Sequence, residues 1–241
     1  MSHIDLSQHP PFIYSDYKSS ATRGPKRAPL DLGVLSRQAN ISVMAELAGN
    51  LTDLYDIGEL EHNMICNSRQ GGEPLGERII VSGRVLNQWG KPEVGVLIEA
   101  WQANAGGRYA HKVDQHDAPL DPNFLGVGRS VTDHEGRYRF YTIKPGAYPW
   151  KNHPNAWRPQ HIHFSLVGKT ITDRLVTQMY FPGDPLLDYD PIFNAVPPMA
   201  RERLISNFDL SVTEADFALG YRFDIVLAGA GATPIDTEDI K

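Results

Sequence analysis

Two histidines two positions apart are the most distinctive chemical feature of the sequence, in the run QHIHF. A β-strand places alternate side chains on opposite faces, so on a strand His161 and His163 would share one face. Ile162, Phe164 and Leu166 would share the other, where their apolar side chains favour the core. Two imidazoles placed in this way can chelate one metal ion, and imidazole suits iron, zinc, copper and nickel. The alternative is a pair of surface histidines on a half-exposed strand.

A metal ion held by two histidines needs further ligands. A ferrous site would add a carboxylate, and a catalytic zinc site would add a third His, a Glu or a Cys. Asp173, Asp184 and His153 are available, but none has a diagnostic spacing. Tyr109 in GGRY and Tyr148 in KPGAYPW are oxygen donors in Gly- and Pro-rich stretches. Because the chain has ten tyrosines, composition alone does not select these two.

Composition and charge exclude several classes of protein. The 241 residues are 41% hydrophobic and carry a formal net charge of −6. The sequence therefore shows no basic patch of the kind that binds nucleic acid or anionic lipid. Cys66 is the only cysteine, which excludes an intrachain disulfide and zinc fingers. The first residues resemble no signal peptide, and no apolar run is long enough to span a membrane. We therefore expect a cytoplasmic protein.

The elements that must position these side chains are mostly strands. Residues 1–75 read as an irregular arm with one helix over 35–51. From residue 76 the pattern changes to short alternating segments, with a turn at 133–136 that predicts a hairpin. This pattern favours a mainly β protein, an antiparallel β-sandwich with long loops and a few short helices, and one domain over 1–241 with its core at 76–230. The predicted strands cover 78–85, 94–101, 127–132, 137–143, 161–167, 175–181 and 221–227.

Three long motifs carry a family resemblance. The stretch VSGRVLNQWGKPEVGVLIEAWQANAGGRY, followed by IKPGAYPW and WRPQHIHF, resembles the intradiol ring-cleavage dioxygenases, and the likeness extends from about Asp16 to Ile225. In that family two tyrosines and two histidines bind Fe(III). The resemblance therefore implies one ferric ion per chain, with four ligands matched motif by motif: Tyr109, Tyr148, His161 and His163. Phenolate is a hard anionic donor that favours Fe(III), and a bound metal lowers the pKa of a coordinating group.

The resemblance also implies how the site works. A catechol would bind as a dianion and displace Tyr148, the axial ligand opposite His161, while Tyr109 and His163 stay equatorial. The departing ligands would take the two catechol protons. Arg158 matches a family arginine beside the substrate, where a fixed cation in a dry pocket would stabilise charge that builds on the ring.

The motifs are most similar to the protocatechuate-cleaving branch of the family. This implies cleavage of 3,4-dihydroxybenzoate by O2 to 3-carboxy-cis,cis-muconate, in the β-ketoadipate route of aromatic catabolism. In this branch the iron-binding chain pairs with a related alpha chain that lacks the iron ligands, so an alpha chain is the implied partner. Trp101 is expected to pack behind the site. The residues matched to the substrate pocket are Tyr17, Trp150, Lys151, Gln178 and Ile192.

Three other functions remain open at the level of sequence. Within the family, the rival is a catechol or hydroxyquinol 1,2-dioxygenase, although such chains tend to be longer and to carry a helical dimerisation domain. Outside the family, the fold pattern also fits a β-sandwich binding module without chemistry. A zinc hydrolase could use the same histidine pair. Metal content and colour separate the family assignment from the binding module and the hydrolase.

Overall fold

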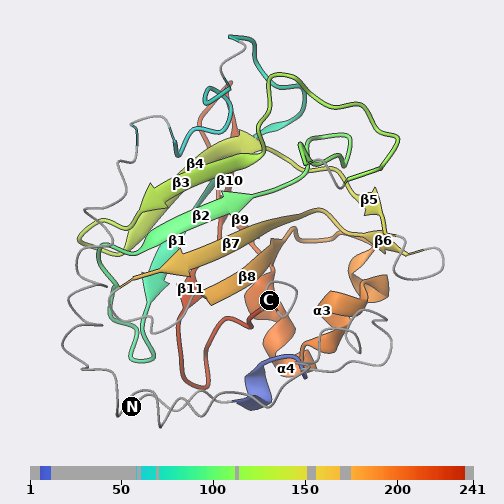
Figure 1. Ribbon diagram of the computed structural model, residues 1–241. Coiled ribbons are helices and arrows are strands. Elements are labelled where there is room, and N and C mark those ends of the chain that lie inside the picture. Colours follow the sequence, from blue (N-terminus) through green and yellow to red (C-terminus); the bar gives the residue numbers. More distant parts are fainter. Residues whose placement is uncertain are drawn as a thin grey trace, which may run out of the picture.

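The chain folds into two facing β-sheets with short helices at one side (Figure 1). The computed structural model describes residues 6–11, 58, 61–68, 71–111, 114–150, 156–168 and 175–236. The described strands are β1 (Arg78–Leu86), β2 (Leu97–Trp101), β3 (Val127–Val131), β4 (Arg137–Ile143), β5 (Tyr148–Pro149), β6 (Trp157–Arg158), β7 (His161–Val167), β8 (Leu175–Tyr180), β9 (Asn207–Phe208), β10 (Leu219–Arg222) and β11 (Ile225–Val226). The described helices are η1 (Leu6–Gln8), η3 (Leu187–Tyr189), α3 (Pro191–Ala195), α4 (Pro198–Arg201) and η4 (Glu202–Leu204).

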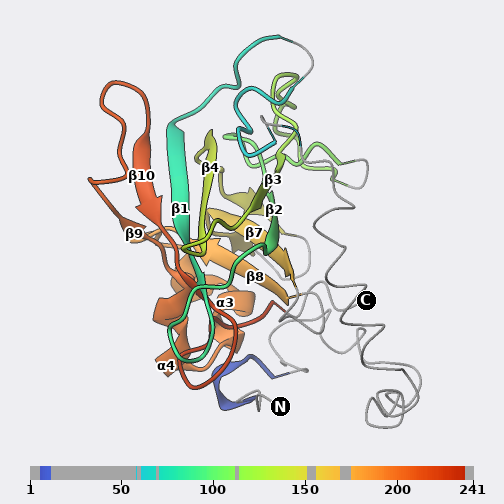
Figure 2. The ribbon, with the colours of Figure 1, turned by 90° about the vertical axis from the view of Figure 1, so that its left-hand side faces the viewer.

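The two sheets differ in how their strands pair. One sheet has the order β3-β2-β7-β8 and is antiparallel throughout. In the other sheet, β1 pairs antiparallel with β4 but parallel with β10 and β11, and β9 pairs with β10. The turned view in Figure 2 shows the two sheets as separate layers. The predicted β-sandwich is therefore confirmed, although one of its sheets is mixed rather than purely antiparallel.

The core lies between the two layers and is built from alternating positions on facing strands. Ile79 and Val81 of β1 point inward, as do Ile162, Phe164 and Leu166 of β7, and each is at most 2% exposed. Burying one such side chain contributes about 1.5–3 kcal/mol, which makes this packing the main support for the sheets. As predicted, the apolar face of β7 enters the core and leaves the two histidines on its opposite face.

The predicted hairpin at residues 133–136 is wrong, because β3 and β4 belong to different sheets. The turn itself is tight: the Asp133 carboxylate accepts from the backbone of Glu135 and Arg137, and Gly136 has a φ of 71°. Just before the turn, the Thr132 hydroxyl donates to the Glu93 carbonyl, which ties the end of β3 to the segment that precedes β2. A tight turn has the same residue signature whether it joins paired strands or crosses between layers.

Most strand bounds lie within one residue of the prediction, but β2 begins at Leu97 rather than at residue 94. β4 and β7 match their predicted ranges, whereas the predicted strand at 221–227 is split into β10 and β11. The predicted helix at 35–51 lies outside the described residues, and the proposed division at residue 75 stays a prediction. No helix within the described ranges is long and apolar enough to cross a membrane.

Candidate metal centre

The two histidines of β7 begin the site at one end of the four-stranded sheet. His161 is 2% exposed and His163 is 5% exposed, so the face opposite the apolar core is buried as well. The Asp184 carboxylate accepts from the backbone N–H of Gln160 at 2.8 Å and fixes the chain just before β7. On β2, Trp101 is paired in register with His163, and the two rings stack with centroids 4.9 Å apart. Trp101 therefore packs behind the site, as expected.

The two tyrosines reach the histidines from loops that are joined to each other. Asn104 organises the first loop, because its side-chain oxygen accepts from the backbone of residues 106 and 108. Asp114 accepts from the backbone N–H of Tyr109 at 2.8 Å. Tyr148 lies on β5, opposite Arg158 on β6. The N–H of Gly146 donates to the Asn104 carbonyl at 2.9 Å, so one bond couples the two loops.

These elements bring the four predicted side chains together. The Tyr109 hydroxyl lies 3.5 Å from His161 Nε2, and the Tyr148 hydroxyl lies 3.4 Å from the same nitrogen. The rings of His161 and His163 have centroids 4.9 Å apart, and the two tyrosine rings have centroids 5.5 Å apart. Two phenol oxygens and two imidazoles therefore share a single small volume.

The environment of His161 keeps it neutral and orients it. Its Nδ1 lies 2.6 Å from the carbonyl oxygen of Pro159, and because a carbonyl only accepts, Nδ1 must carry the proton. The lone pair is then on Nε2, which faces both tyrosine hydroxyls. Burial lowers the pKa of His161 well below its usual range, and the charges of Arg158 and His163 act in the same direction. A neutral imidazole with a directed lone pair is the form that binds metals.

The donor set fits a hard, highly charged metal ion. In the described part of the chain, no group of three or more His, Cys, Asp or Glu side chains is placed to hold a metal, so the further donors beside the histidines are the two phenol oxygens. His163 Nδ1 is buried without a hydrogen bond, although an imidazole that binds a metal through one nitrogen usually donates a hydrogen bond through the other. Asp184, one of the carboxylates considered from sequence, is instead occupied by the backbone of Gln160.

Arg158 lies beside the centre in a fully buried polar network. It is 1% exposed, its Nε lies 3.1 Å from Asp190 Oδ1, and it also donates to Gln178 Oε1. The Tyr180 hydroxyl lies 3.1 Å from Asp190 Oδ2 and 2.9 Å from Gln178 Oε1. Burial raises the pKa of Tyr180 well above its usual range, and Asp190 adds to the effect, so its hydroxyl stays protonated. Arg158 is thus a buried, paired cation close enough to His161 to lower the pKa of that imidazole.

The predicted substrate residues are only partly placed. The Arg158 guanidinium lies 5.4 Å from the centre of the Trp150 ring, so Trp150 is beside the network. Gln178 is 2% exposed and lies within that network. Ile192 is half-buried in the first turn of α3, and its backbone N–H donates to Asp190. Tyr17 and Lys151 lie outside the described residues.

Sequence reasoning missed three members of the site: Asp190, Tyr180 and Asp236. Asp190 precedes Pro191 at the start of α3, and an Asp followed by a Pro predicts the beginning of a helix. The same pattern does not indicate that the Asp190 carboxylate is buried against an arginine. Tyr180 reads as an ordinary strand aromatic. Asp236 is far from the motifs along the chain, so only the fold reveals its place next to Gln178.

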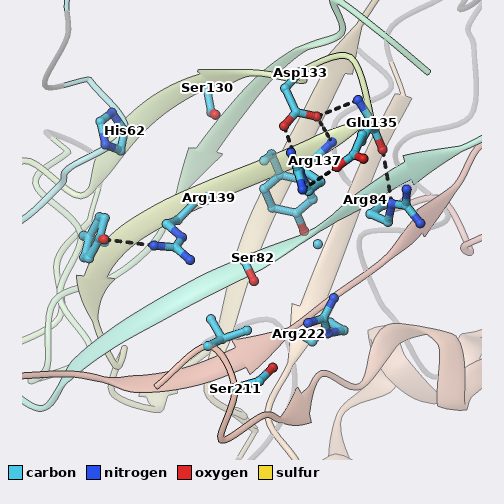
Figure 3. A pocket seen from close by; sticks show the side chains of 14 residues that line it. His62, Ser82, Arg84, Ser130, Asp133, Glu135, Arg137, Arg139, Ser211 and Arg222 are labelled. Carbon is cyan, nitrogen blue, oxygen red and sulfur yellow. Dashed lines mark hydrogen bonds and ion pairs between the residues drawn. The ribbon is translucent and has the colours of Figure 1, made fainter. Parts of the chain in front are cut away.

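Away from the metal centre, a hollow of about 860 Å³ lies over the mixed sheet. Figure 3 shows arginine side chains around Ser82, and the register places Arg139 of β4 and Arg222 of β10 on either side of it. Arg137 pairs with Asp133, and Arg222 pairs with Asp209. We call this hollow the arginine pocket; its lining includes Ser82, Arg84, Arg137, Arg139, Tyr141 and Arg222. It contains none of the four clustered tyrosines and histidines.

Two half-buried tyrosines and two buried histidines meet at the end of a β-sandwich. The chain belongs to the intradiol dioxygenases: the family model described as "Dioxygenase" matches residues 52–229, and the model described as "Protocatechuate 3,4-dioxygenase beta subunit N terminal" matches residues 4–32. It is therefore an oxidoreductase of a family that generally uses non-haem iron.

The chain is similar to several named members of this family. The chain is 60% identical to the protocatechuate 3,4-dioxygenase beta chain of Burkholderia cepacia over 96% of its own length and 95% of that protein. It is 30% identical to the protocatechuate 3,4-dioxygenase alpha chain of Pseudomonas putida, over 80% of this chain and 89% of that one. Among solved structures, 3-chlorocatechol 1,2-dioxygenase of Rhodococcus opacus aligns with a TM-score of 0.54 at 26% identity, covering 70% of this chain and 65% of that one.

Proposed function

We propose that this chain is the iron-bearing beta chain of a protocatechuate 3,4-dioxygenase. The enzyme cleaves 3,4-dihydroxybenzoate with O2 between the two hydroxyl-bearing carbons and yields 3-carboxy-cis,cis-muconate. The observation that carries the proposal is the convergence of the Tyr109 and Tyr148 hydroxyls on His161 Nε2, at 3.5 and 3.4 Å. The high identity to a beta chain of that name, over nearly the full length of both proteins, supports the choice of substrate.

The proposed cofactor is one ferric ion per chain, held by Tyr109, Tyr148, His161 and His163. Two phenolates offset two of its three positive charges, which lowers the cost of placing the ion in a buried site. When bound, Fe(III) supplies a Lewis acid that draws electron density from a catecholate and so prepares the ring to react with O2.

The chain's own residues bind the substrate, move its protons and balance its charge. We propose that the Tyr148 phenolate oxygen would accept a catechol proton when the substrate binds. The Pro159 carbonyl holds the His161 ring in one orientation, because His161 Nδ1 lies 2.6 Å from its oxygen. Arg158, held by Asp190, presents a fixed cation toward the site and stabilises negative charge that develops on the ring.

An alpha chain is the proposed partner. This chain is 60% identical to a protein named as a beta chain. It is also 30% identical to a protein named as an alpha chain, so the two chain types share a fold. Trp157 lies on β6 next to Arg158 and is 45% exposed, which leaves an aromatic side chain at the edge of the site for a partner to cover. The substrate's carboxylate would enter from this edge, beside Trp150.

A visible absorption spectrum tests the proposal directly. The protein is purified after co-expression with an alpha-like chain, and spectra are taken before and after anaerobic addition of protocatechuate. We expect a red-brown tyrosinate-to-Fe(III) band that shifts when protocatechuate binds. A coloured protein that responds to catechol but not to protocatechuate would move the assignment within the family. A colourless protein with full iron or zinc occupancy would contradict the proposal that Tyr109 and Tyr148 bind the metal.

A further inference from the structure

Residues 233–236 form a short segment that closes one side of the candidate metal centre. The backbone N–H of Asp236 donates to the Val176 carbonyl at 2.7 Å, and the Thr177 hydroxyl donates to the Pro234 carbonyl at 2.7 Å. Thr233 exchanges two further bonds with Val226 of β11. The segment is therefore fastened to β8 and β11, and this fastening carries the side chain of Asp236 into the interior, where the residue is 5% exposed.

The Asp236 carboxylate lies between two groups of the site. Gln178 donates to Asp236 Oδ2 through its amide nitrogen, while its amide oxygen accepts from Arg158. This orientation of the amide is forced, because a guanidinium only donates and a carboxylate only accepts. On its other side, Asp236 Oδ2 lies 3.7 Å from His163 Nδ1. A continuous path of polar contacts thus joins Arg158, Gln178, Asp236 and His163.

The two histidines of β7 differ in what stands behind them. His161 Nδ1 has a backbone carbonyl at 2.6 Å, whereas His163 Nδ1 is buried and has no hydrogen bond. If His163 binds a metal through Nε2, its Nδ1 must carry a proton, and a buried N–H needs an acceptor. In the described part of the chain, Asp236 is the carboxylate placed to accept that proton's bond. Trp101, stacked on the ring, confines the imidazole to the plane in which this contact can form.

We infer that Asp236 is a positioning residue for His163: its carboxylate accepts the Nδ1–H bond, fixes the tautomer and aims Nε2 at the cluster. The inference rests on the proposed iron site. It makes the two imidazoles unequal donors, because an anionic partner makes His163 a more basic ligand than His161 with its neutral carbonyl. The Asp236 carboxylate would also connect His163 to Arg158 by hydrogen bonds that pass through Gln178.

A purely structural role is the competing explanation, because the same segment fastens β8 to β11. Thr177 separates the two roles. Its buried hydroxyl anchors the segment by donating to the Pro234 carbonyl rather than to His163 or Asp236. Thr177→Val therefore weakens the anchoring and leaves the carboxylate, whereas Asp236→Asn removes the charge and preserves the shape of the side chain.

The test compares both variants with the wild-type enzyme, each co-expressed with the alpha-like chain. The measurements are iron retained during dialysis against a chelator, the position of the visible band, and the thermal midpoint of the iron-free protein. For Asp236→Asn we expect iron affinity to fall on the order of 10- to 100-fold and the band to shift. For Thr177→Val we expect a lower thermal midpoint with wild-type iron retention and an unshifted band.

Two results would overturn the inference: wild-type iron retention and band position in Asp236→Asn, or the same iron loss in Thr177→Val. The pair Asp236→Glu and Asp236→Gln repeats the comparison at equal side-chain length, so the outcome does not depend on folding of the Asn variant. There, better iron retention in Asp236→Glu supports the inference and equal retention overturns it. A wild-type protein without iron or a visible band is a different outcome, since it refutes the proposed iron site itself.

Discussion

Arginine–aspartate pairs occur both in the candidate metal centre and in the arginine pocket, and their surroundings differ more than their geometry. Arg158 Nε lies 3.1 Å from Asp190, with both side chains at most 1% exposed. Arg222 Nε lies 2.7 Å from Asp209, with side chains 42% and 22% exposed. The shorter contact is at the surface, where water and salt screen it. Distance alone therefore does not rank these two pairs, whereas burial does.

The partners also come from different parts of the chain. In the arginine pocket, Arg137 pairs with Asp133, four positions away in the same turn. In the metal centre, Arg158 on β6 meets Asp190 at the start of α3 and Gln178 on β8. A local pair forms wherever its turn forms, but the buried network exists only when the whole sandwich is folded. This dependence gives the buried cation a fixed position, which is the property that catalysis requires.

The largest effect is expected from Arg158→Leu. The variant leaves Asp190 buried without its cation, which costs about 3–5 kcal/mol of folding free energy. It also removes the proposed stabilising charge, so most turnover with protocatechuate is lost. Urea unfolding and O2 consumption measure the two effects. The matched surface variant Arg222→Leu should change both much less, and equal losses in the two variants would contradict the ranking by burial.

A double variant separates stability from chemistry at the same position. In Arg158→Leu with Asp190→Leu, no unpaired buried charge remains, so much of the lost folding free energy should return. Turnover should stay low, because the cation is still missing. Recovery of turnover together with stability would mean that Arg158 acts only by supporting the fold.

A smaller effect, on the rate of substrate binding, is expected from Tyr148→Phe. The variant keeps the ring but loses the phenol oxygen, so the proposed proton acceptor is missing and anaerobic binding of protocatechuate should slow on the order of 100-fold. Stopped-flow absorbance measures this rate. Tyr141→Phe is the control, because it removes a tyrosine hydroxyl bound to Glu214 in the arginine pocket. Unchanged binding kinetics in Tyr148→Phe would refute its role as proton acceptor.

The sequence predicts local structure in this protein better than it predicts which strands and side chains far apart in the chain contact each other. β4 and β7 could be bounded from alternation alone, because one face of each enters the core. The turn at Asp133 was recognisable, yet which strands it joins depends on contacts across the sheets. Likewise, the QHIHF pattern indicated a shared histidine face, but the choice of Tyr109 among ten tyrosines required the family motif.

The acidic members of the site illustrate the limit most clearly. Asp190 and Asp236 have no local pattern that distinguishes them from surface carboxylates, and each becomes special only because a distant residue faces it. Buried carboxylates of this kind are chosen by partners that the fold supplies. Their identification therefore needed the pairing of β8 with its neighbours and the path of residues 233–236.

Backbone contact between the tyrosine loops gives a further test at intermediate size. A Cβ added at Gly146 would lie 2.3 Å from the Ala105 carbonyl oxygen, so Gly146→Ala must separate the loops that carry Tyr109 and Tyr148. We expect a loss of about 1–3 kcal/mol in unfolding free energy, together with weaker iron retention. Gly231→Ala is the control, since nothing lies within 4 Å of its added Cβ. Wild-type iron retention in Gly146→Ala would show that the loops position the tyrosines independently.

The smallest effect is expected at the surface pair and depends on pH. Bonds from Ser211 and the Arg222 guanidinium lower the pKa of Asp209 from 3.8 to about 2. Because the folded pKa lies below the unfolded one, the ionised carboxylate contributes stability above about pH 4, and this contribution is lost as pH falls toward 2. The urea midpoint of Asp209→Asn should therefore lie slightly below that of the wild type at pH 7, and the gap should close between pH 4 and pH 2. A difference in urea midpoint that stays constant with pH would show that the Asp209 carboxylate acts through its shape rather than its charge. A difference that shrinks with added salt at pH 7 would show that the exposed Arg222–Asp209 pair is screened, unlike the buried Arg158–Asp190 pair.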